Sequence, residues 1–540
     1  PVCARMRARL LPTVSVLLAG LAQAVAVAMP GSGQPLWWLQ ILSLSVLGWQ
    51  LHGCAGNLAS WSSSTWSDTR RRPAWQSDWR GAAWLGWVFA TAWLCGTFWW
   101  LFISMHTYGG LAAPLAALAV LALASALALY YAAACAVFFR LFLTIPSARW
   151  SWAALVFAAA WTLAELARGR WLTGFPWGAG GYAHTVGPLA GYAPWVGVYG
   201  IGAVAAWAAF MTVGLVASPQ GRLRRVAALA LVVLLVPMGA RWAMPSFTHS
   251  AGHLDVTLLQ GNIPQDQKFV PGTGVDDALR WYGAALVDSR SALTVAPETA
   301  LPVLPRQLPP GYWESLQAHF RSRDRAALIG IPLGNARDGY TNSVAGIKPG
   351  QEEVQRYDKH HLVPFGEFIP PFFQWFLDLM NIPLGEFRRG ALAQPSFDWK
   401  GQRLAPNICY EDLFGEELGA RFADPGRAPT VMVNLSNIAW FGDSVAIDQH
   451  LQISRMRALE FQRPMLRATN TGATVIIDHR GEVVASLPRL TRGALEGKVE
   501  GRDGNTPYAS WVARLGLWPL WVLALAVLAA AAWQLRRAPD

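Results

Sequence analysis

The chain has 540 residues, of which 53% are hydrophobic and only 14% are charged. An average soluble domain carries about 25% charged residues, so this composition argues against a wholly soluble protein and against a disordered one. The sequence therefore predicts an integral membrane protein. Its 29 Trp residues are consistent with aromatic belts at a membrane interface.

The net charge of +11 belongs to one half of the chain. Residues 1–250 hold 15 Arg, no Lys and three acids, whereas residues 251–540 are nearly neutral. Arg between hydrophobic runs usually reports helix orientation in a bilayer, while a nucleic-acid-binding surface needs a basic, polar face. The basic excess thus indicates membrane topology and excludes nucleic acid as a partner.

Eight apolar runs are long enough to span a bilayer, which takes roughly 20 apolar residues in a helix. Seven precede the polar half and one follows it, so we expect a membrane bundle of about eight transmembrane α-helices. The first run also resembles a signal peptide, but its length favours a retained span. The runs are 9–28, 36–56, 81–105, 112–143, 151–168, 191–217, 223–244 and 511–535.

Arg residues gather in alternate loops between these runs. One set of loops and ends holds 14 Arg, whereas the opposite short loops hold only Arg168 and Arg170. The positive-inside rule then places both termini in the cytoplasm and the polar half outside it. We expect a seven-helix region over residues 1–244, an extracytoplasmic domain over 245–508, and a last helix with a short tail over 509–540.

Glu165 is the only acid inside an apolar run. An intramembrane carboxylate is a functional hypothesis by default. Because Glu165 lies one turn from the end of its run, with Arg168 three residues on, snorkelling of both side chains to the interface is an equal alternative.

The polar half alternates β-rich and helical runs, which indicates one layered α/β domain. A turn over residues 478–482 predicts a hairpin. We expect helices at 276–289, 311–323 and 450–462. We expect strands at 253–260, 292–296, 326–331, 341–347, 404–410, 430–435, 465–469 and 474–478.

Cys409 is the only one of the five Cys that lies in the polar half. It falls between a β-rich run and a helix-compatible run, and a nucleophile on such a tight turn is exposed. A buried structural Cys is the other interpretation, and the local pattern does not decide between them. Glu298, which ends an apolar strand, and Lys359 are each, taken singly, more typical of solvated charges.

Three motifs, taken together, favour a catalytic interpretation of Cys409, Glu298 and Lys359. Pro297–Thr299, Lys359–Glu367 and Ile408–Glu411 resemble the Glu–Lys–Cys triad of the nitrilase superfamily, a resemblance that covers residues 253–500. Together with the order of spans, Lys359–Glu367 also resembles the apolipoprotein N-acyltransferase family more narrowly. Matching segments at 173–177, 260–265 and 437–444 extend this resemblance over nearly the whole chain. It implies a nitrilase-like αββα sandwich in the polar half.

The resemblance also implies an activity. A member of this family moves a fatty acyl group from a phospholipid, here phosphatidylethanolamine, through a Cys thioester to the N-terminal amine of a diacylglyceryl-cysteine on an apolipoprotein. It implies Cys409 as nucleophile and Lys359 as the cation that stabilises the thiolate and the oxyanion. Glu298 is the implied base, a role that requires burial to hold its pKa well above that of a solvated carboxylate. The implied location is the bacterial inner membrane, with the catalytic domain in the periplasm.

Other residues match positions around this triad. The resemblance implies that Glu367 and Glu411 support the triad and that the backbone N–H of Tyr410 faces the oxyanion. Loop hydrogen bonding for Glu367 and a helix N-terminal charge for Glu411 are the plainer alternatives. Implied substrate contacts are Gln265, Phe269, Phe175, Trp177 and Trp440.

Two other function classes stay open at this point. One is a membrane-tethered nitrilase-type amidohydrolase acting on a small C–N substrate, and the other is a transporter whose outer domain only binds. The apolar stretch Phe365–Met380, which is either core or an arm that admits acyl chains, argues against the amidohydrolase. The scarcity of charge within the helices argues against the transporter. Adjacent His360 and His361 would point apart on a strand, and we expect no metal and no organic cofactor.

Overall fold

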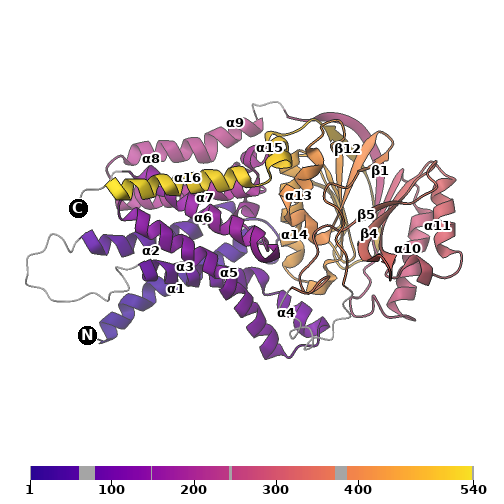
Figure 1. Ribbon diagram of the computed structural model, residues 1–540, viewed down its shortest axis with the longest axis horizontal. Coiled ribbons are helices and arrows are strands. Elements are labelled where there is room, and N and C mark those ends of the chain that lie inside the picture. The colour runs from indigo at the N-terminus through magenta and orange to yellow at the C-terminus, as the bar shows by residue number, and fades with distance from the viewer. Residues whose placement is uncertain (1, 60–78, 147–148, 243–245, 371–385, 538–540) are drawn as a thin grey trace, which may run out of the picture. The chain divides into compact units, whose positions relative to one another are not determined.

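The computed structural model describes most of the chain (Figure 1). The described residues are 2–59, 79–146, 149–242, 246–370 and 386–537. They form two compact units, which we call the helical unit and the α/β unit. The helical unit comprises residues 1–99, 117–244 and 517–540, and the α/β unit comprises residues 100–116 and 245–516.

The helical unit consists mainly of long apolar helices. Its α-helices are α1 (Val2–Val27), α2 (Trp37–Ala59), α3 (Trp79–Phe98), α5 (Ala113–Phe142), α6 (Trp150–Arg170), α7 (Ala193–Ala217), α8 (Arg222–Leu229), α9 (Val236–Trp242) and α16 (Trp518–Arg537). Shorter turns are the 3₁₀ segments η3 (Trp171–Thr173), η4 (Gly180–His184) and η5 (Pro188–Tyr192), and the π segment η6 (Ala230–Leu235) between α8 and α9. Fully buried aromatic rings such as Trp93, Trp161 and Tyr131 fill its core.

Among the described residues, five helices are long and apolar enough to cross a membrane. A sixth results if the bent pair of α15 (Pro507–Leu515) and α16 counts as one span. The expected run at 36–56 is helical as well, in α2, and so is the described part of the run at 223–244, in α8 to α9. The structure thus supports an apolar helical bundle, while the count of eight spans stays a prediction.

Glu165 and Arg168 are both buried in the helical unit, each 1% exposed. Glu165 Oε1 accepts a hydrogen bond from the backbone N–H of Gly180 at 2.9 Å. Arg168 Nε donates to the hydroxyl of Tyr131 at 2.9 Å, and its Nη1 donates to the carbonyls of Phe175 and Trp177. The two side chains therefore bind turns inside this unit, and the snorkelling alternative is wrong.

The α/β unit contains two six-stranded sheets. Their strand orders are β12-β1-β2-β3-β4-β5 and β11-β10-β9-β8-β7-β6. Strands β1, β2 and β3 run parallel, as do β7, β8 and β9, while the outer strands are antiparallel. The strands are β1 (His249–Gln260), β2 (Leu293–Ala296), β3 (Ala326–Asn335), β4 (Gly339–Ile347), β5 (Gln355–Asp358), β6 (Phe397–Trp399), β7 (Gln402–Ile408), β8 (Val431–Ser436), β9 (Met465–Thr469), β10 (Val475–Ile477), β11 (Val483–Ser486) and β12 (Gly493–Asp503).

Side-chain alternation builds the layers of this unit. Leu254, Val256 and Leu258 of β1 face a core shared with Val431 and Val433 of the second sheet. Outward-facing residues of the first sheet pack against two helices, and two further helices lie on the opposite side of the sandwich (Figure 1). These helices are α10 (Gly274–Asp288) and α11 (Tyr312–Arg321) on the first side, and α13 (Gly415–Gly419) and α14 (Ala446–Phe461) on the other. This is the expected αββα arrangement.

Residues 100–116, which end in the first turn of α5, belong to the α/β unit, and the apolar runs do not predict this. They contain α4 (Leu101–Ile103) and the π segment η2 (Ser104–Tyr108). Trp100 Nε1 donates to Gln449 Oε1 of α14 at 3.0 Å, and its ring lies 4.2 Å from that of Phe441. The indole therefore anchors the segment beside the 3₁₀ turn η10 (Ile438–Phe441).

All eight expected strands and all three expected helices overlap observed elements, and the hairpin at 478–482 joins β10 to β11. The β-rich runs do not predict β5, β6 or β12, each of which ends a sheet or lies at its edge. Edge strands often carry charged side chains, as the sequence of β12 does, so hydrophobic patterning cannot reveal them. Remaining short elements are η7 (Pro305–Gln307), η8 (Cys409–Leu413) and η9 (Ala420–Phe422).

Candidate active site

Cys409 occupies the turn where β7 ends and η8 begins. Its backbone φ is +50°, a left-handed value that is uncommon for a residue other than Gly. The carbonyl of Cys409 accepts hydrogen bonds from Asn434 Nδ2 at 3.3 Å and from His450 Nε2 at 3.2 Å. These contacts hold the turn, and the carboxyl end of a parallel strand is where α/β folds place reacting groups.

Glu298 and Lys359 meet beside this turn. Glu298 follows β2 and Lys359 follows β5, and the distance from Lys359 Nζ to Glu298 Oε1 is 3.3 Å. Lys359 Nζ also lies 3.0 Å from Glu367 Oε1. Asn342 Nδ2 donates to both carboxylates, at 2.7 Å in each case. One buried ammonium thus pairs with two carboxylates that share an amide donor.

The outer oxygens of these carboxylates are held by backbone. Glu298 Oε2 accepts from the N–H of Asn437 at 2.8 Å, and Glu367 Oε2 accepts from the N–H of Val363 at 2.8 Å. Glu367 therefore binds both Lys359 and the loop that follows it, which combines the supporting role and the loop role expected from the sequence.

The charges of this cluster act on one another. Burial raises the pKa of Glu298, but Lys359 and the Asn342 amide outweigh it, so the pKa lies below its ordinary value. Burial lowers the pKa of Lys359, but Glu298 and Glu367 more than compensate, so that pKa lies above its ordinary value. Burial and the Glu298 carboxylate raise the pKa of Cys409 to about 12.

These directions correct one expectation. The sequence-based mechanism requires a Glu298 pKa above that of a solvated carboxylate, whereas the structure lowers it. The resting pair is therefore a neutral thiol at Cys409 beside an ionised Glu298. In the attack that the family resemblance implies for Cys409, proton transfer has to accompany bond formation, because only the new bond to carbon and the developing oxyanion offset its cost.

A second buried Lys lies at the site, and the sequence motifs do not predict it. Lys268 is 1% exposed, and its Nζ donates to the backbone carbonyl of Glu298 at 3.0 Å. Burial lowers the pKa of Lys268 to about 7, although Glu298 and Cys409 oppose the shift. The only sequence signal for Lys268 is its place just after the 260–265 segment.

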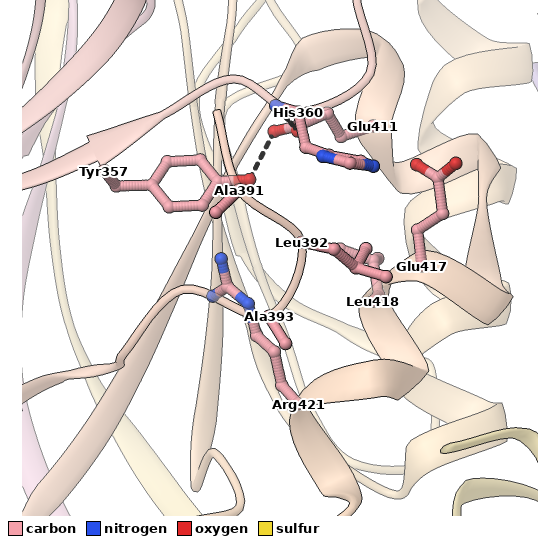
Figure 2. Close-up of a pocket in the computed structure, with 9 residues that line it drawn as sticks. All are labelled: Tyr357, His360, Ala391, Leu392, Ala393, Glu411, Glu417, Leu418 and Arg421. Carbon is pink, nitrogen blue, oxygen red and sulfur yellow. Dashed lines mark hydrogen bonds between the residues drawn. The ribbon is translucent and has the colours of Figure 1, made fainter. Parts of the chain in front are cut away.

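Glu411 joins the Cys409 turn to the Lys359 segment, and Figure 2 shows its contact with Tyr357. Its Oε2 accepts from the Tyr357 hydroxyl at 2.8 Å and from the N–H of Ile408 at 2.6 Å. Its Oε1 accepts from the N–H groups of His360 at 2.6 Å and His361 at 3.2 Å. Glu411 is 3% exposed, so it is a buried bridge and not a solvated charge at a helix terminus.

The cavity in Figure 2 lies against this bridge. It is lined in part by Tyr357, Glu411 and Arg421, and its volume is about 10 Å³. That volume accommodates about one water molecule. The cavity therefore does not hold substrate.

The other sequence-predicted residues lie in several places. Gln265 Oε1 accepts a hydrogen bond from Asn437 Nδ2 at 2.9 Å. The backbone N–H of the same Asn437 donates to Glu298. The ring of Trp440 lies 5.9 Å from that of Tyr108, and Phe269 is 41% exposed beside Lys268. In the helical unit, the ring of Phe175 lies 4.6 Å from that of Phe98, and the carbonyl of Trp177 accepts from Arg168. The ring of Tyr410 lies 5.3 Å from that of Phe414.

Two further expectations concern the apolar stretch Phe365–Met380 and metal binding. Most of the stretch Phe365–Met380, expected to admit acyl chains, lies outside the described residues. Over the ranges that are described, no group of three or more His, Cys, Asp or Glu side chains is placed to hold a metal ion.

A buried polar cluster lies behind the Cys409 turn. Asp412 Oδ1 is 2.8 Å from His450 Nε2, and Arg467 Nη2 is 2.8 Å from His450 Nδ1. Because Arg can only donate, Nδ1 accepts and Nε2 carries the proton, which it shares between Asp412 and the Cys409 carbonyl. Burial and Arg467 lower the pKa of His450, which keeps the imidazole neutral. His450 is thus a positioning residue for the turn.

For the acylation that the resemblance implies at Cys409, we expect His450→Phe to lower the rate by at least about tenfold, because the turn loses a donor and Asp412 loses a partner. His450→Gln keeps an N–H near the Nε2 position and should recover most of the rate. Both variants are compared with wild type by single-turnover acylation at equal thermal stability. Equal rates in the two variants would contradict the role of this hydrogen bond.

Comparisons with known proteins cover both units. The apolipoprotein N-acyltransferase N-terminal domain family matches residues 19–211, and the carbon-nitrogen hydrolase family matches residues 257–503. An apolipoprotein N-acyltransferase from Verminephrobacter eiseniae is 56% identical over 523 residues, which are 93% of this chain and 92% of that protein.

Two further relatives carry the same name. The apolipoprotein N-acyltransferase of Ralstonia nicotianae is 45% identical over 507 residues, 93% of this chain and 90% of that protein. That of Bordetella bronchiseptica is 44% identical over 481 residues, 83% of this chain and 87% of that protein.

Proposed function

The chain belongs to the apolipoprotein N-acyltransferase family, and we propose that Cys409 carries the fatty acyl group between donor and acceptor. The protein is a membrane-bound acyltransferase of lipoprotein maturation, with a phospholipid as donor and an apolipoprotein as acceptor. The observation that supports the residue-level proposal is the cluster at Cys409. There, an ionised carboxylate and a buried ammonium, 3.3 Å apart, both act on one thiol.

In the first half-reaction, Cys409 Sγ attacks the ester carbonyl of the phospholipid while Glu298 takes the thiol proton. Lys359 stabilises the oxyanion that forms. The carbon–oxygen bond then breaks, and Glu298 returns the proton to the alkoxide of the departing lysophospholipid. Glu367 and Glu411 keep Lys359 and the Cys409 turn in place during this step.

In the second half-reaction, the N-terminal amine of the acceptor attacks the thioester carbonyl. Glu298 accepts the amine proton and passes it to Cys409 Sγ as the carbon–sulfur bond breaks. The products are an amide on the lipoprotein and a free thiol. This ping-pong order requires that water be kept from the thioester.

We further propose eight transmembrane helices, both termini in the cytoplasm, and a periplasmic catalytic domain of the inner membrane spanning residues 245–508. The uneven Arg distribution in short loops supports this orientation, and the five or six candidate spans among the described helices support the embedding. Phosphatidylethanolamine is the proposed donor.

Mass spectrometry tests the central proposal. Purified wild-type protein incubated with phosphatidylethanolamine is expected to gain one acyl group on Cys409, whereas Cys409→Ala gains none. Adding a diacylglyceryl-cysteine peptide is expected to move that group to the peptide amine. The acyltransferase proposal fails if wild type gains no adduct or if Cys409→Ala gains an equal one. Release of free fatty acid with no peptide amide would favour the hydrolase alternative.

A further inference from the structure

Lys268 belongs to a turn whose main chain is held in place. Asn470, which follows β9, accepts a hydrogen bond from the N–H of Ile263 at 3.0 Å and donates one to the carbonyl of Ile263 at 2.9 Å. The carbonyl of Pro264 then accepts from the N–H of Lys268 at 2.9 Å. The side chain of Lys268 therefore starts from a fixed position.

The other end of this side chain reaches the main chain of Glu298. Lys268 is 1% exposed, and its Nζ donates to the carbonyl of Glu298 at 3.0 Å. Among the described residues, this ammonium has no salt-bridge partner. Burying an unpaired ammonium is costly, and a neutral donor would hold one carbonyl at a lower cost. The burial of Lys268 therefore indicates a use for its charge beyond this hydrogen bond.

The charges around Glu298 supply such a use. Glu298 and Glu367 both lie against Lys359, so this group contains two carboxylates and one ammonium. When Cys409 reacts as proposed, its proton passes to Glu298 while a negative charge develops on the substrate oxygen, so the total charge stays the same. A second cation close to the group balances the second carboxylate before and during this step.

Lys268 interacts electrostatically with both reacting groups. Burial lowers the pKa of Lys268 to about 7, while Glu298 and Cys409 oppose this shift. Burial raises the pKa of Glu298, but Lys359 and, more weakly, Lys268 help to bring that pKa below its ordinary value. On the same turn as Lys268, Asp266 is exposed. A charged Lys268 thus favours the carboxylate of Glu298 and the thiolate of Cys409.

We propose that Lys268 is the second cation of this site, a positioning residue that holds the main chain of Glu298 and favours the ionised forms of Glu298 and Cys409 through its charge. The proposal rests on the proposed function for the reaction that this charge serves. In this role Lys268 forms and breaks no covalent bond. Lys359 binds the carboxylate of Glu298, whereas Lys268 binds the carbonyl of the same residue.

Methyl methanethiosulfonate, a small uncharged reagent, tests this role without a lipid, because it reacts with the thiolate of Cys409. Lys268→Met removes the charge and the donors, whereas Lys268→Gln removes the charge and keeps an N–H donor. At about pH 6, both variants are expected to react about three- to tenfold more slowly than wild type, because a nearby cation lowers the pKa of a thiol. The gap should narrow toward about pH 9, because wild-type Lys268 loses its proton over that range. Peptide mass spectrometry follows the reaction at Cys409.

Lys348→Met is the matched control. Lys348 Nζ also donates to a main-chain carbonyl, that of Asp398 at 2.7 Å, but it lies outside the site. The rate at Cys409 in this variant should equal the wild-type rate at every pH. All rates are measured below the unfolding temperature of each variant.

The outcomes separate this proposal from the proposed function. Equal rates in Lys268→Met and wild type at about pH 6 would overturn the role of the charge. Recovery of the wild-type rate in Lys268→Gln would overturn it as well, since the hydrogen bond alone would then be sufficient, and so would a gap that does not change with pH. If the gap behaves as expected but wild type gains no acyl group from phosphatidylethanolamine, the role of Lys268 stands and the acyl-transfer proposal fails.

Discussion

Replacing Lys359 by Met is expected to lower the rate of Cys409 acylation by about 10²–10³, the usual cost of losing one donor to an oxyanion. The substitution keeps the length of the side chain and removes only the charge and the donors. Single-turnover acylation by phosphatidylethanolamine, followed by intact-protein mass spectrometry, measures the rate. A rate within threefold of wild type would contradict the role of Lys359.

The same substitution should also destabilise the α/β unit. It leaves Glu298 and Glu367 as buried carboxylates without their cation, a change that typically costs about 3–5 kcal/mol. With Lys359 present, the pKa of Glu298 lies below its ordinary value, so its contribution is present above the unfolded pKa and is lost as pH falls through the folded pKa. In the variant, burial without the cation favours the neutral form of Glu298, so the stability deficit of Lys359→Met should shrink as pH falls toward and then below about 4.3, the ordinary Glu pKa.

A double variant separates stability from catalysis. Adding Glu367→Gln to Lys359→Met removes one of the two unpaired charges and should restore part of the lost stability. It restores no donor to the oxyanion, so the acylation rate should stay low. Recovery of the rate along with the stability would mean that Lys359 acts only through folding.

Replacing Glu411 by Ala is expected to have the second-largest effect. It leaves three backbone N–H groups and the Tyr357 hydroxyl without their acceptor. Hydrogen bonds to a charged group contribute about 1.5–3 kcal/mol each, so a loss of at least about 3 kcal/mol is expected. Because the bridge fixes the Cys409 turn relative to Lys359, acylation should also fall by about 10².

Tyr357→Phe is the matched control for this bridge. It removes one hydrogen bond and leaves the three backbone contacts of Glu411 in place, so it should cost about 1.5 kcal/mol, the lower end of that range, and leave acylation near the wild-type rate. Thermal unfolding in detergent and single-turnover acylation measure both quantities. Equal losses of stability and of acylation rate in Tyr357→Phe and Glu411→Ala would contradict the role of Glu411 as a bridge between the two segments.

Much of the α/β fold was predictable because its central strands are buried on both faces and read as β-rich runs. Strands such as β1 and β8 bury Val and Leu between the sheets. The edge strands β5, β6 and β12 lack that signal, since among the described residues each has a neighbouring strand on one side only. The motifs around Glu298, Lys359 and Cys409 are sufficient to predict where the site lies in the sequence.

The parts of the site that escaped prediction depend on contacts between distant residues. Asn342 lies in β4 and reaches Glu298 from 44 positions along the chain, and no local pattern marks an Asn for that task. The same holds for Lys268 and for His450, which act through partners far away in sequence. The lowered pKa of Glu298 follows from this surrounding set, so its direction could not be read from the Glu itself.

The left-handed backbone at Cys409 bears on which substitutions preserve the resting conformation. Its φ of +50° is maintained by donors to its own carbonyl, from Asn434 and His450, and none of these contacts involves the sulfur. Ala or Ser at this position meets the same steric demand as Cys and keeps the same anchors. A protein with Ala or Ser at this position is therefore suited to binding a phospholipid without cleaving it, because it lacks the sulfur while the backbone of the turn keeps its conformation.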